Sequence, residues 1–252
     1  MGIRGRTLGR IIISYPTHPA FLWAYLLVGI VLALLFSGLP TVVADASEAA
    51  DAHLLATLAV LLIVLSPPLS FINVALAEIN VGATITEIGV DYVEFFGIPI
   101  PIPRVRTREV STILAINFGG AIVPIVASVI FAYLLSSSSL RGVFTLASLI
   151  DVAVTSIIIY FLSRPVAGVG IVVPAFMAPL IAALVAVVTA GFGVVAATAA
   201  YIGGSIGSLI GADVLRLSRS LGELKAPMLS IGGAGIFDGV FLSGILAFVL
   251  AL

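Results

Sequence analysis

Long apolar runs recur along the chain and restrict it to a fold that lies in a membrane. A helix that crosses about 30 Å of hydrocarbon needs about 20 mostly apolar residues, because each residue rises 1.5 Å. Of the 252 residues, 61% are hydrophobic and only 9% are charged, whereas an ordinary soluble domain has about 25% charged residues. A water-soluble fold could not bury this much apolar surface, so we expect an integral membrane protein.

The apolar runs predict an all-α polytopic membrane protein of about seven transmembrane helices in a single membrane domain, 1–252. Turns rich in Ser, Gly, Pro or charged residues separate them. The expected spans are 20–36, 54–77, 110–135, 142–162, 166–189, 194–213 and 228–250. The fifth and sixth form one apolar stretch, which we divide at 190–193.

Basic residues predict the orientation, because short cytoplasmic loops are enriched in Lys and Arg. With the N-terminus inside, ten of the eleven basic residues are cytoplasmic and only Arg141 lies outside. The ten are Arg4, Arg6, Arg10, Arg104, Arg106, Arg108, Arg164, Arg216, Arg219 and Lys225. Seven crossings would put the C-terminus outside, and we expect a multi-pass protein of the plasma membrane. Residues 1–36 could instead be a signal peptide, although Trp23 suits an interfacial anchor better.

The largest loop, 78–109, is expected to lie in the cytoplasm and to hold a short β-hairpin followed by a Pro-rich arm. Apolar and polar residues alternate over 84–88, which is the two-residue period of a strand. Pro alternates with Ile over 98–103, a composition typical of polyproline conformation. The loop would serve either as a rigid connector or as a docking surface.

Two carboxyl groups fall near the middle of the expected spans, where a charge is costly and usually faces a cavity or a partner. Asp151 lies in the fourth span and Asp238 in the seventh, and no Lys, Arg or His lies within any span to neutralise them. Each must be protonated, hydrogen-bonded, hydrated or bound to a cation. Such a carboxyl suits proton exchange. The alternative is a purely structural role, in which the protonated carboxyl forms a hydrogen bond to a neighbouring helix.

Glycine and proline interrupt several spans, and carriers often line their ion or substrate sites with such broken helices. Asp213 follows a Gly-x-x-x-Gly-x-x-x-Gly ridge over 203–211, which predicts close packing against another helix. We take six residues as candidates for an ion or solute path: Asn117, Asp151, Pro174, Asp213, Gly235 and Asp238.

Three segments carry a family resemblance: AINFGGAIVP at 115–124, IGAD at 210–213 and SIGGAGIFDG at 230–239. They resemble signatures of an archaeal and bacterial membrane family catalogued as domain of unknown function sixteen-fourteen. The likeness covers most of the chain from about residue 54, and it implies a family without implying an activity.

A second resemblance is to intramembrane aspartyl proteases of the presenilin and preflagellin-peptidase type. Residues 235–238 match the Gly-x-hydrophobic-Asp motif of those enzymes, and 174–176 resemble their Pro-Ala-Leu. The resemblance implies that Asp238 and Asp151 are a catalytic pair that shares a proton and activates water. The chain departs from the pattern because Ile150 stands where the family has Tyr, and because Pro174 precedes the second aspartate instead of following it.

Three functions are compatible with these features. A carrier of a small ion or solute explains the acids and the broken helices, and we rank it first. An intramembrane aspartyl protease is second, and a non-catalytic scaffold subunit is third. The expected partners are the lipid bilayer and a small cation or proton, with a homo-oligomer allowed, no nucleic acid and no cofactor. Whether a metal binds is left open, although the absence of Cys excludes thiolate ligands and a Cys nucleophile.

Overall fold

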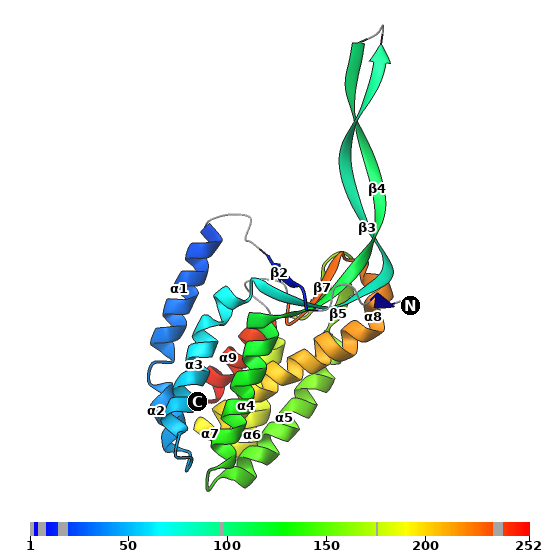
Figure 1. Cartoon of the computed structure of the whole chain (residues 1–252). Helices are drawn as coiled ribbons and strands as arrows, with labels where there is room; N and C mark the ends of the chain where they lie inside the picture. Colours follow the sequence, from blue (N-terminus) through cyan, green and yellow to red (C-terminus); the bar gives the residue numbers. More distant parts are fainter. Residues whose placement is uncertain (1–2, 5–8, 15–19, 96–97, 175, 234–238) are drawn as a thin grey trace.

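The protein is described by a computed structural model that covers residues 3–4, 9–14, 20–95, 98–174, 176–233 and 239–252. A bundle of helices carries a β-sheet at one end, and a long hairpin projects from that sheet away from the bundle (Figure 1). Within these described ranges, four helical segments are long and apolar enough to cross a membrane, which indicates a membrane protein: Ala52–Leu69, Phe118–Ser136, Arg141–Leu162 and Val194–Leu224.

The helices follow one another along the chain with few strands between them. The α-helices are α1 (Ala20–Leu35), α2 (Leu39–Asp45), α3 (Ala52–Leu69), α4 (Val123–Ser136), α5 (Arg141–Leu162), α6 (Met177–Ala190), α7 (Val194–Ile202), α8 (Leu217–Leu224) and α9 (Gly239–Ala251). In the described part of the chain, three π-helical segments interrupt them: η2 (Phe118–Ile122), η3 (Gly203–Gly207) and η4 (Leu209–Arg216). Because η2 continues into α4, and α7, η3, η4 and α8 form one run, the π-helical turns lie inside two of the four long segments.

The strands form two sheets among the described residues. The larger sheet has the order β1 (Ile3–Arg4), β3 (Ile72–Phe95), β4 (Ile98–Asn117) and β7 (Met228–Ile231), and β2 (Ile11–Ile13) also pairs with β3. Its pairs are antiparallel except for β4 with β7. A separate hairpin joins β5 (Arg164–Val166) to β6 (Gly170–Val172).

The prediction of an all-α protein with seven spans is wrong. Strands hold 21% of the chain. Among the residues that the structure describes, at most five spans pass the length test, the fifth being α1 and α2 taken together across a 42° bend. α6 and α9 have 14 and 13 residues, so each is about 20 Å long and shorter than the hydrocarbon core. The error arose because hydropathy does not separate an apolar strand from an apolar helix, and several expected spans ran into strands.

The hairpin is also much longer than the sequence predicted. Its strands start at Ile72 and end at Asn117, so they take the end of the second expected span and the start of the third. Residues 98–103 pair with 90–95 of β3 and are therefore strand, not a separate polyproline arm.

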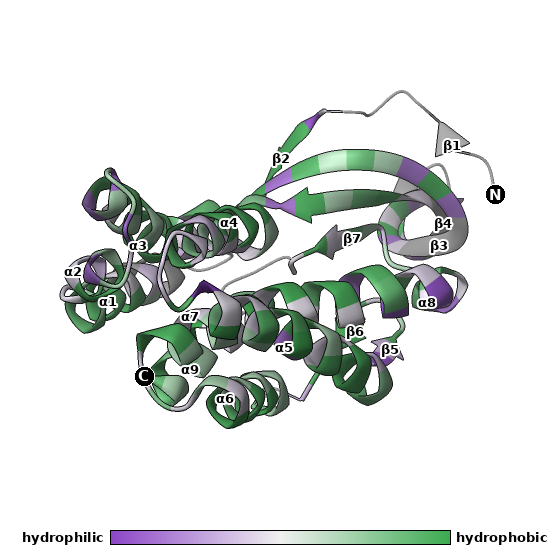
Figure 2. Ribbon diagram, turned by 90° about the horizontal axis from the view of Figure 1, so that it is seen from below, coloured by the Kyte–Doolittle hydropathy of each residue, from purple (hydrophilic) through white to green (hydrophobic). Residues whose placement is uncertain are grey.

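The core of the bundle is built from aromatic residues set among small ones. Phe131 packs edge-on against Tyr201 with ring centroids 5.3 Å apart, and Phe248 lies 6.4 Å from Phe131. All residues of α7 from Val195 to Ile202 are buried. Large apolar side chains are also exposed on the outer faces of the helices, including Trp23, Leu184 and Val188. Figure 2 shows the helix ribbons mostly in the green of hydrophobic residues. Such outer faces suit contact with lipid.

The predicted glycine ridge is confirmed as a close contact with α5. A Cβ on Gly207 would lie 2.8 Å from Cβ of Thr155, and one on Gly211 would lie 2.5 Å from the carbonyl oxygen of Ser156. These separations are below normal van der Waals distance, so only glycine lets the two helices approach this closely.

Candidate functional site

Asp151 is enclosed in the helix bundle on α5. Its side chain is 0% exposed, and Oδ1 accepts a hydrogen bond of 2.9 Å from Thr155 Oγ1, one turn later on the same helix. Oδ2 has no hydrogen-bond partner in the described part of the chain. A buried carboxyl oxygen without a donor is costly, which marks Asp151 as a group that the packing alone does not explain.

The carboxyl of Asp151 lies against the backbone of the first π-helical turn after α7. A Cβ on Gly203 would be 2.1 Å from Cγ of Asp151, so the absence of a side chain at Gly203 makes room for the carboxyl. The widened i→i+5 turns of π-helices occur often at functional sites. Asp151 therefore faces the backbone of η3 at Gly203, where a side chain would leave the carboxyl no room.

A group of serines lies on the side of η3 that faces α9. Ser243 Oγ donates 2.9 Å to the carbonyl oxygen of Gly204 and lies 3.1 Å from Ser208 Oγ. Gly244 on α9 is also in close contact with Ser205. η3 thus has a carboxyl on one side and hydroxyl groups on the other.

Asn117 organises the junction between the sheet and the bundle. It is buried at the end of β4, and its Oδ1 accepts 2.7 Å from the backbone N–H of Gly120, which caps η2. Its Nδ2 donates to the carbonyl oxygen of Ser70 at 2.7 Å and to Oδ1 of Asn73 at 3.0 Å. Ser230 on β7 donates to the same Asn73 oxygen at 2.7 Å. One amide therefore connects α3, β3, η2 and, through Asn73, β7.

Asp213 is held at the same junction by the loop that follows β7. Its Oδ2 accepts 2.6 Å from the backbone N–H of Gly232. Gly232 has a positive φ of 82°, and a Cβ there would lie 2.6 Å from the Ala121 side chain in η2. The three signature segments, far apart in the sequence, therefore meet at one place: 115–124 at η2, 210–213 at Asp213 and 230–239 at Gly232.

Residues 68–250 match the model of a family described as Protein of unknown function (DUF1614). The chain belongs to this family. The match confirms the first resemblance seen in the sequence, and all three signature segments lie inside it. No curated protein and no solved structure matches the chain at a significant level. Membership of DUF1614 supplies no activity, and the likeness to aspartyl proteases stays a prediction.

Pro174, another predicted residue of this DUF1614 protein, is not part of the junction. Pro174 is exposed, in an open groove of about 430 Å³ that also contains Arg164. Gly235 and Asp238 fall outside the described residues, so the pairing of Asp151 with Asp238 stays a prediction. Over the described part of the chain, no group of three or more His, Cys, Asp or Glu could hold a metal ion.

The sequence reasoning missed Asn73, the residue that joins Asn117 to β7. Asn occurs three times in the chain, and two of these residues share a hydrogen bond at the buried junction. An amide inside an apolar segment needs hydrogen-bond partners. That rarity was the signal available in the sequence.

Proposed function

We propose that the protein is a carrier of protons or small cations in the plasma membrane and that Asp151 is its ion-binding carboxyl. The observation that carries the proposal is the unpaired Oδ2 of a fully buried acid inside a membrane-type bundle. A carboxylate at such a place is expensive unless a proton or a cation compensates it. Among the described residues no ion pair to Asp151 supplies that compensation.

The surroundings of Asp151 support reversible binding. Thr155 fixes one carboxyl oxygen, and Gly203 leaves the other side of the carboxyl against the irregular backbone of η3. Irregular backbone at membrane depth can contribute carbonyl ligands to a cation. A carboxyl with one fixed and one free oxygen can accept a proton or join such a ligand set.

Asp213 is a second acidic residue on the proposed path of ions to Asp151, and it lies nearer the sheet end of the molecule. It lies ten residues beyond Gly203 on the same helical run, a separation of about 15 Å along the axis. Unlike Asp151 it is only half-buried, so it is the better placed of the two to exchange with water. In this proposal, ions from the sheet end would meet Asp213 before Asp151.

The test is ion flux into proteoliposomes that contain the purified full-length protein. A pH-sensitive dye inside the vesicles would report proton movement, with Na⁺ and K⁺ gradients applied separately. Asp151→Asn keeps the size of the side chain and the bond from Thr155 but cannot titrate, so flux should be lost. Asp45→Asn changes an exposed acid on α2 and is the matched control, which should keep wild-type flux.

Three results would count against the proposal. Unchanged flux in Asp151→Asn would exclude this carboxyl as the ion site. Wild-type protein that moves no ion but cleaves a transmembrane peptide would favour the protease, provided that Asp151→Asn and Asp238→Asn abolish cleavage. Wild-type protein inactive in both assays, with variants that change only stability, would favour a scaffold.

A further inference from the structure

Three arginines lie at the sheet end of the bundle, where α5, η4 and α8 meet the small hairpin of β5 and β6: Arg164, Arg216 and Arg219. Arg164 begins β5, two residues after α5 ends. The N–H of Gly168, at the turn of this hairpin, donates 2.7 Å to the carbonyl oxygen of Leu224 at the end of α8. All three arginines belong to the basic residues expected on the cytoplasmic side.

The length of the helices places these arginines near the lipid headgroups. The run Val194–Leu224 has 31 residues and is about 46 Å long, whereas the hydrocarbon core is about 30 Å thick. Its first turn lies at the opposite end of the bundle, where the N–H of Gly193 donates to the carbonyl oxygen of Ala251. The last turns of the run therefore extend into the headgroup region. Tyr160 lies at the corresponding end of α5, and tyrosine is enriched at this level of a membrane.

Arg216 and Arg219 share the ring of Tyr160. Their guanidinium carbons lie 5.6 Å and 5.4 Å from the centroid of this ring, which is within the range of cation–π attraction. Arg219 Nη1 also donates 2.8 Å to the hydroxyl oxygen of Tyr160. Nε of Arg216 is buried and has no acceptor in the described part of the chain. One ring thus orders two positive charges and leaves a buried donor unsatisfied.

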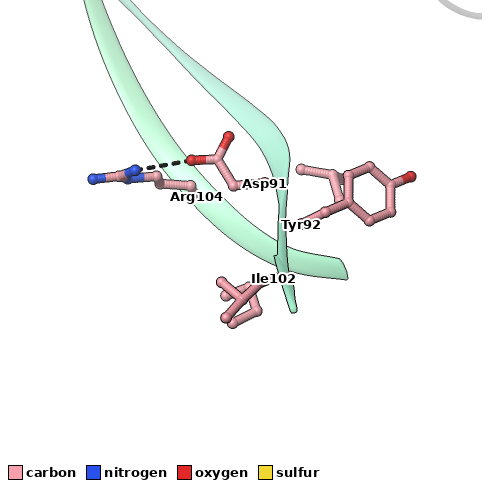
Figure 3. A pocket seen from close by; sticks show the side chains of 6 residues that line it. Asp91, Tyr92, Ile102 and Arg104 are labelled. Atoms are coloured by element: carbon pink, nitrogen blue, oxygen red, sulfur yellow. Dashed lines mark hydrogen bonds and ion pairs between the residues drawn. The ribbon is translucent and has the colours of Figure 1, made fainter. Parts of the chain in front are cut away.

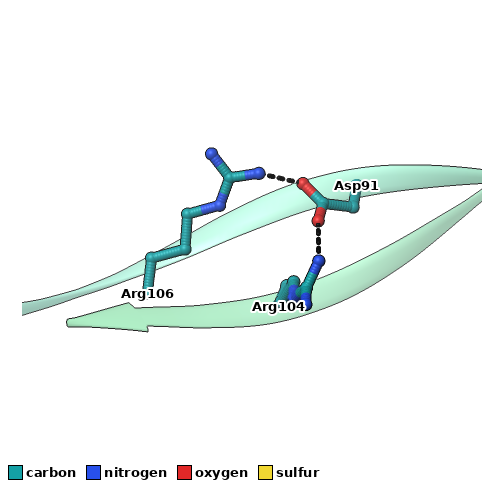
Figure 4. Close-up of polar contacts among 3 residues, drawn as sticks. All are labelled: Asp91, Arg104 and Arg106. Atoms are coloured by element: carbon teal, nitrogen blue, oxygen red, sulfur yellow. Dashed lines mark hydrogen bonds and ion pairs between the residues drawn. The ribbon is translucent and has the colours of Figure 1, made fainter.

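Among the described residues, no acid forms an ion pair with these arginines. The arginines of the long hairpin differ, because Arg104 and Arg106 both pair with Asp91. Figure 3 shows Asp91 turned toward Arg104, and Figure 4 shows both arginines at its carboxylate. Glu223 is exposed on α8, yet it forms no ion pair with Arg219 one turn earlier. Neighbouring like charges repel, so an anion bound at Tyr160 would stabilise this arrangement.

Phe161 links the ring of Tyr160 to an open apolar groove. Its ring centroid lies 5.2 Å from that of Tyr160, and 75% of Phe161 is exposed. The groove has a volume of about 430 Å³, and Arg164 is the charged residue in a lining that is otherwise apolar: Phe161, Leu162, Val166, Val172, Val173 and Pro174. Apolar walls favour a hydrocarbon chain and offer nothing to a free phosphate ion. The ligand suited to both parts therefore has an anionic head and an apolar tail.

We propose that this site binds one anionic phospholipid of the cytoplasmic leaflet. The phosphate oxygens accept hydrogen bonds from Arg216 and Arg219, Arg164 adds a third positive charge, and an acyl chain lies along Phe161 in the groove. Arginine suits this task because its planar guanidinium group binds phosphate in bidentate fashion. Basic pockets between helices on the cytoplasmic side are a known place for anionic headgroups. A lipid bound here would hold the end of α5 against α8.

The test is native mass spectrometry of the purified full-length protein in detergent, with phosphatidylglycerol or phosphatidylcholine of the same acyl chains added. Wild-type protein should bind one phosphatidylglycerol more tightly than phosphatidylcholine. Arg216→Gln combined with Arg219→Gln should weaken phosphatidylglycerol binding at least about tenfold. The control, Arg104→Gln combined with Arg106→Gln, removes the same charge from the hairpin and should keep wild-type binding. Equal affinity of the wild type for both lipids, or unchanged binding in the Arg216 and Arg219 variant, would overturn the proposal.

Phe161→Ser tests the groove without changing a charge, and it decides the matter even if the arginine variant fails to fold. Phe192→Ser is the matched control, because Phe192 is 76% exposed and lies at the opposite end of the bundle, between α6 and α7. Phosphatidylglycerol binding should fall in Phe161→Ser and stay unchanged in Phe192→Ser. If Phe161→Ser bound the lipid as tightly as the wild type and inorganic phosphate displaced it, the occupant would be a free anion and the lipid assignment would be wrong. No ion flux is measured, so the lipid site is tested separately from the carrier.

Discussion

Gly211→Ala offers a sharp test of the packing between α5 and the long helical run Val194–Leu224. The added methyl group would lie 2.5 Å from the carbonyl oxygen of Ser156 and 3.2 Å from Cβ of Ile159. Ordinary contact begins at 3.4 Å, so the first distance is about 0.9 Å too short. A backbone oxygen cannot rotate away as a flexible side chain can. The two helices would therefore have to separate, which would loosen the contact at Gly207 as well.

The expected loss follows from comparing two alanine substitutions in one helical run. Gly→Ala inside a helix gains about 1 kcal/mol from helix propensity, and overpacking costs about 1–3 kcal/mol. Gly222 on α8 has open space where a Cβ would stand, so Gly222→Ala receives the gain without the clash. The difference between the two variants should therefore be about 1–3 kcal/mol, which corresponds to roughly 2–12 °C in Tm for a chain of this length.

The assay is thermal unfolding in detergent, followed by circular dichroism in the helical band at one fixed heating rate, because membrane proteins often unfold irreversibly. Gly211→Ala should melt below Gly222→Ala, and Gly207→Leu should melt lower still. If Gly211→Ala melted at or above Gly222→Ala, the close approach of α5 to the ridge would not exist and the reasoning would be refuted.

Three further predictions concern other parts of the molecule. Asn117→Ala leaves the N–H of Gly120 and the carbonyl of Ser70 without their hydrogen-bond partner, which costs about 1–3 kcal/mol per buried group. The Tm of this variant should therefore fall, whereas the exposed control Thr107→Ala should leave the Tm unchanged. The hydrogen bond and charge of Arg104 and Arg106 lower the pKa of Asp91. These ion pairs therefore stabilise the hairpin at pH values above 3.8, the ordinary pKa of the unfolded chain. The stabilisation is lost as the pH falls through the lower pKa of the folded state. Pepsin should accordingly cut the wild-type hairpin faster at the lowest pH, and Asp91→Asn should remove that dependence on pH. Because basic residues mark the cytoplasmic side, a membrane-impermeant maleimide added to whole cells should label Arg141→Cys but not Glu87→Cys, and the reverse pattern would invert the orientation.

The candidate site could be predicted in its residue types but not in its grouping. Asp151 stood out because an acid among apolar residues is rare, and the structure places it in a buried, partly unpaired position. Asn117 and Asp213 were chosen for an ion path inside the spans. The structure instead places Asn117 at the end of strand β4, and Asp213 accepts a hydrogen bond from the backbone N–H of Gly232. A one-dimensional hydropathy reading could not reveal this, because the contacts join separate segments: Asp213 and Gly232 are 19 residues apart, Asn117 and Ser70 are 47 apart, and Asn73 and Ser230 are 157 apart.

Composition alone determined that the chain belongs in a membrane, because no arrangement of 61% hydrophobic residues with 9% charge could hide its apolar surface from water. The four-residue glycine spacing likewise determined a face for close helix packing, since that spacing repeats once per helical turn. Only the tertiary structure decided which apolar segments became strands. An Ile- and Val-rich segment satisfies its backbone equally well within a helix or against a neighbouring strand, and the choice for 72–77 and 110–117 depends on each segment having the other beside it.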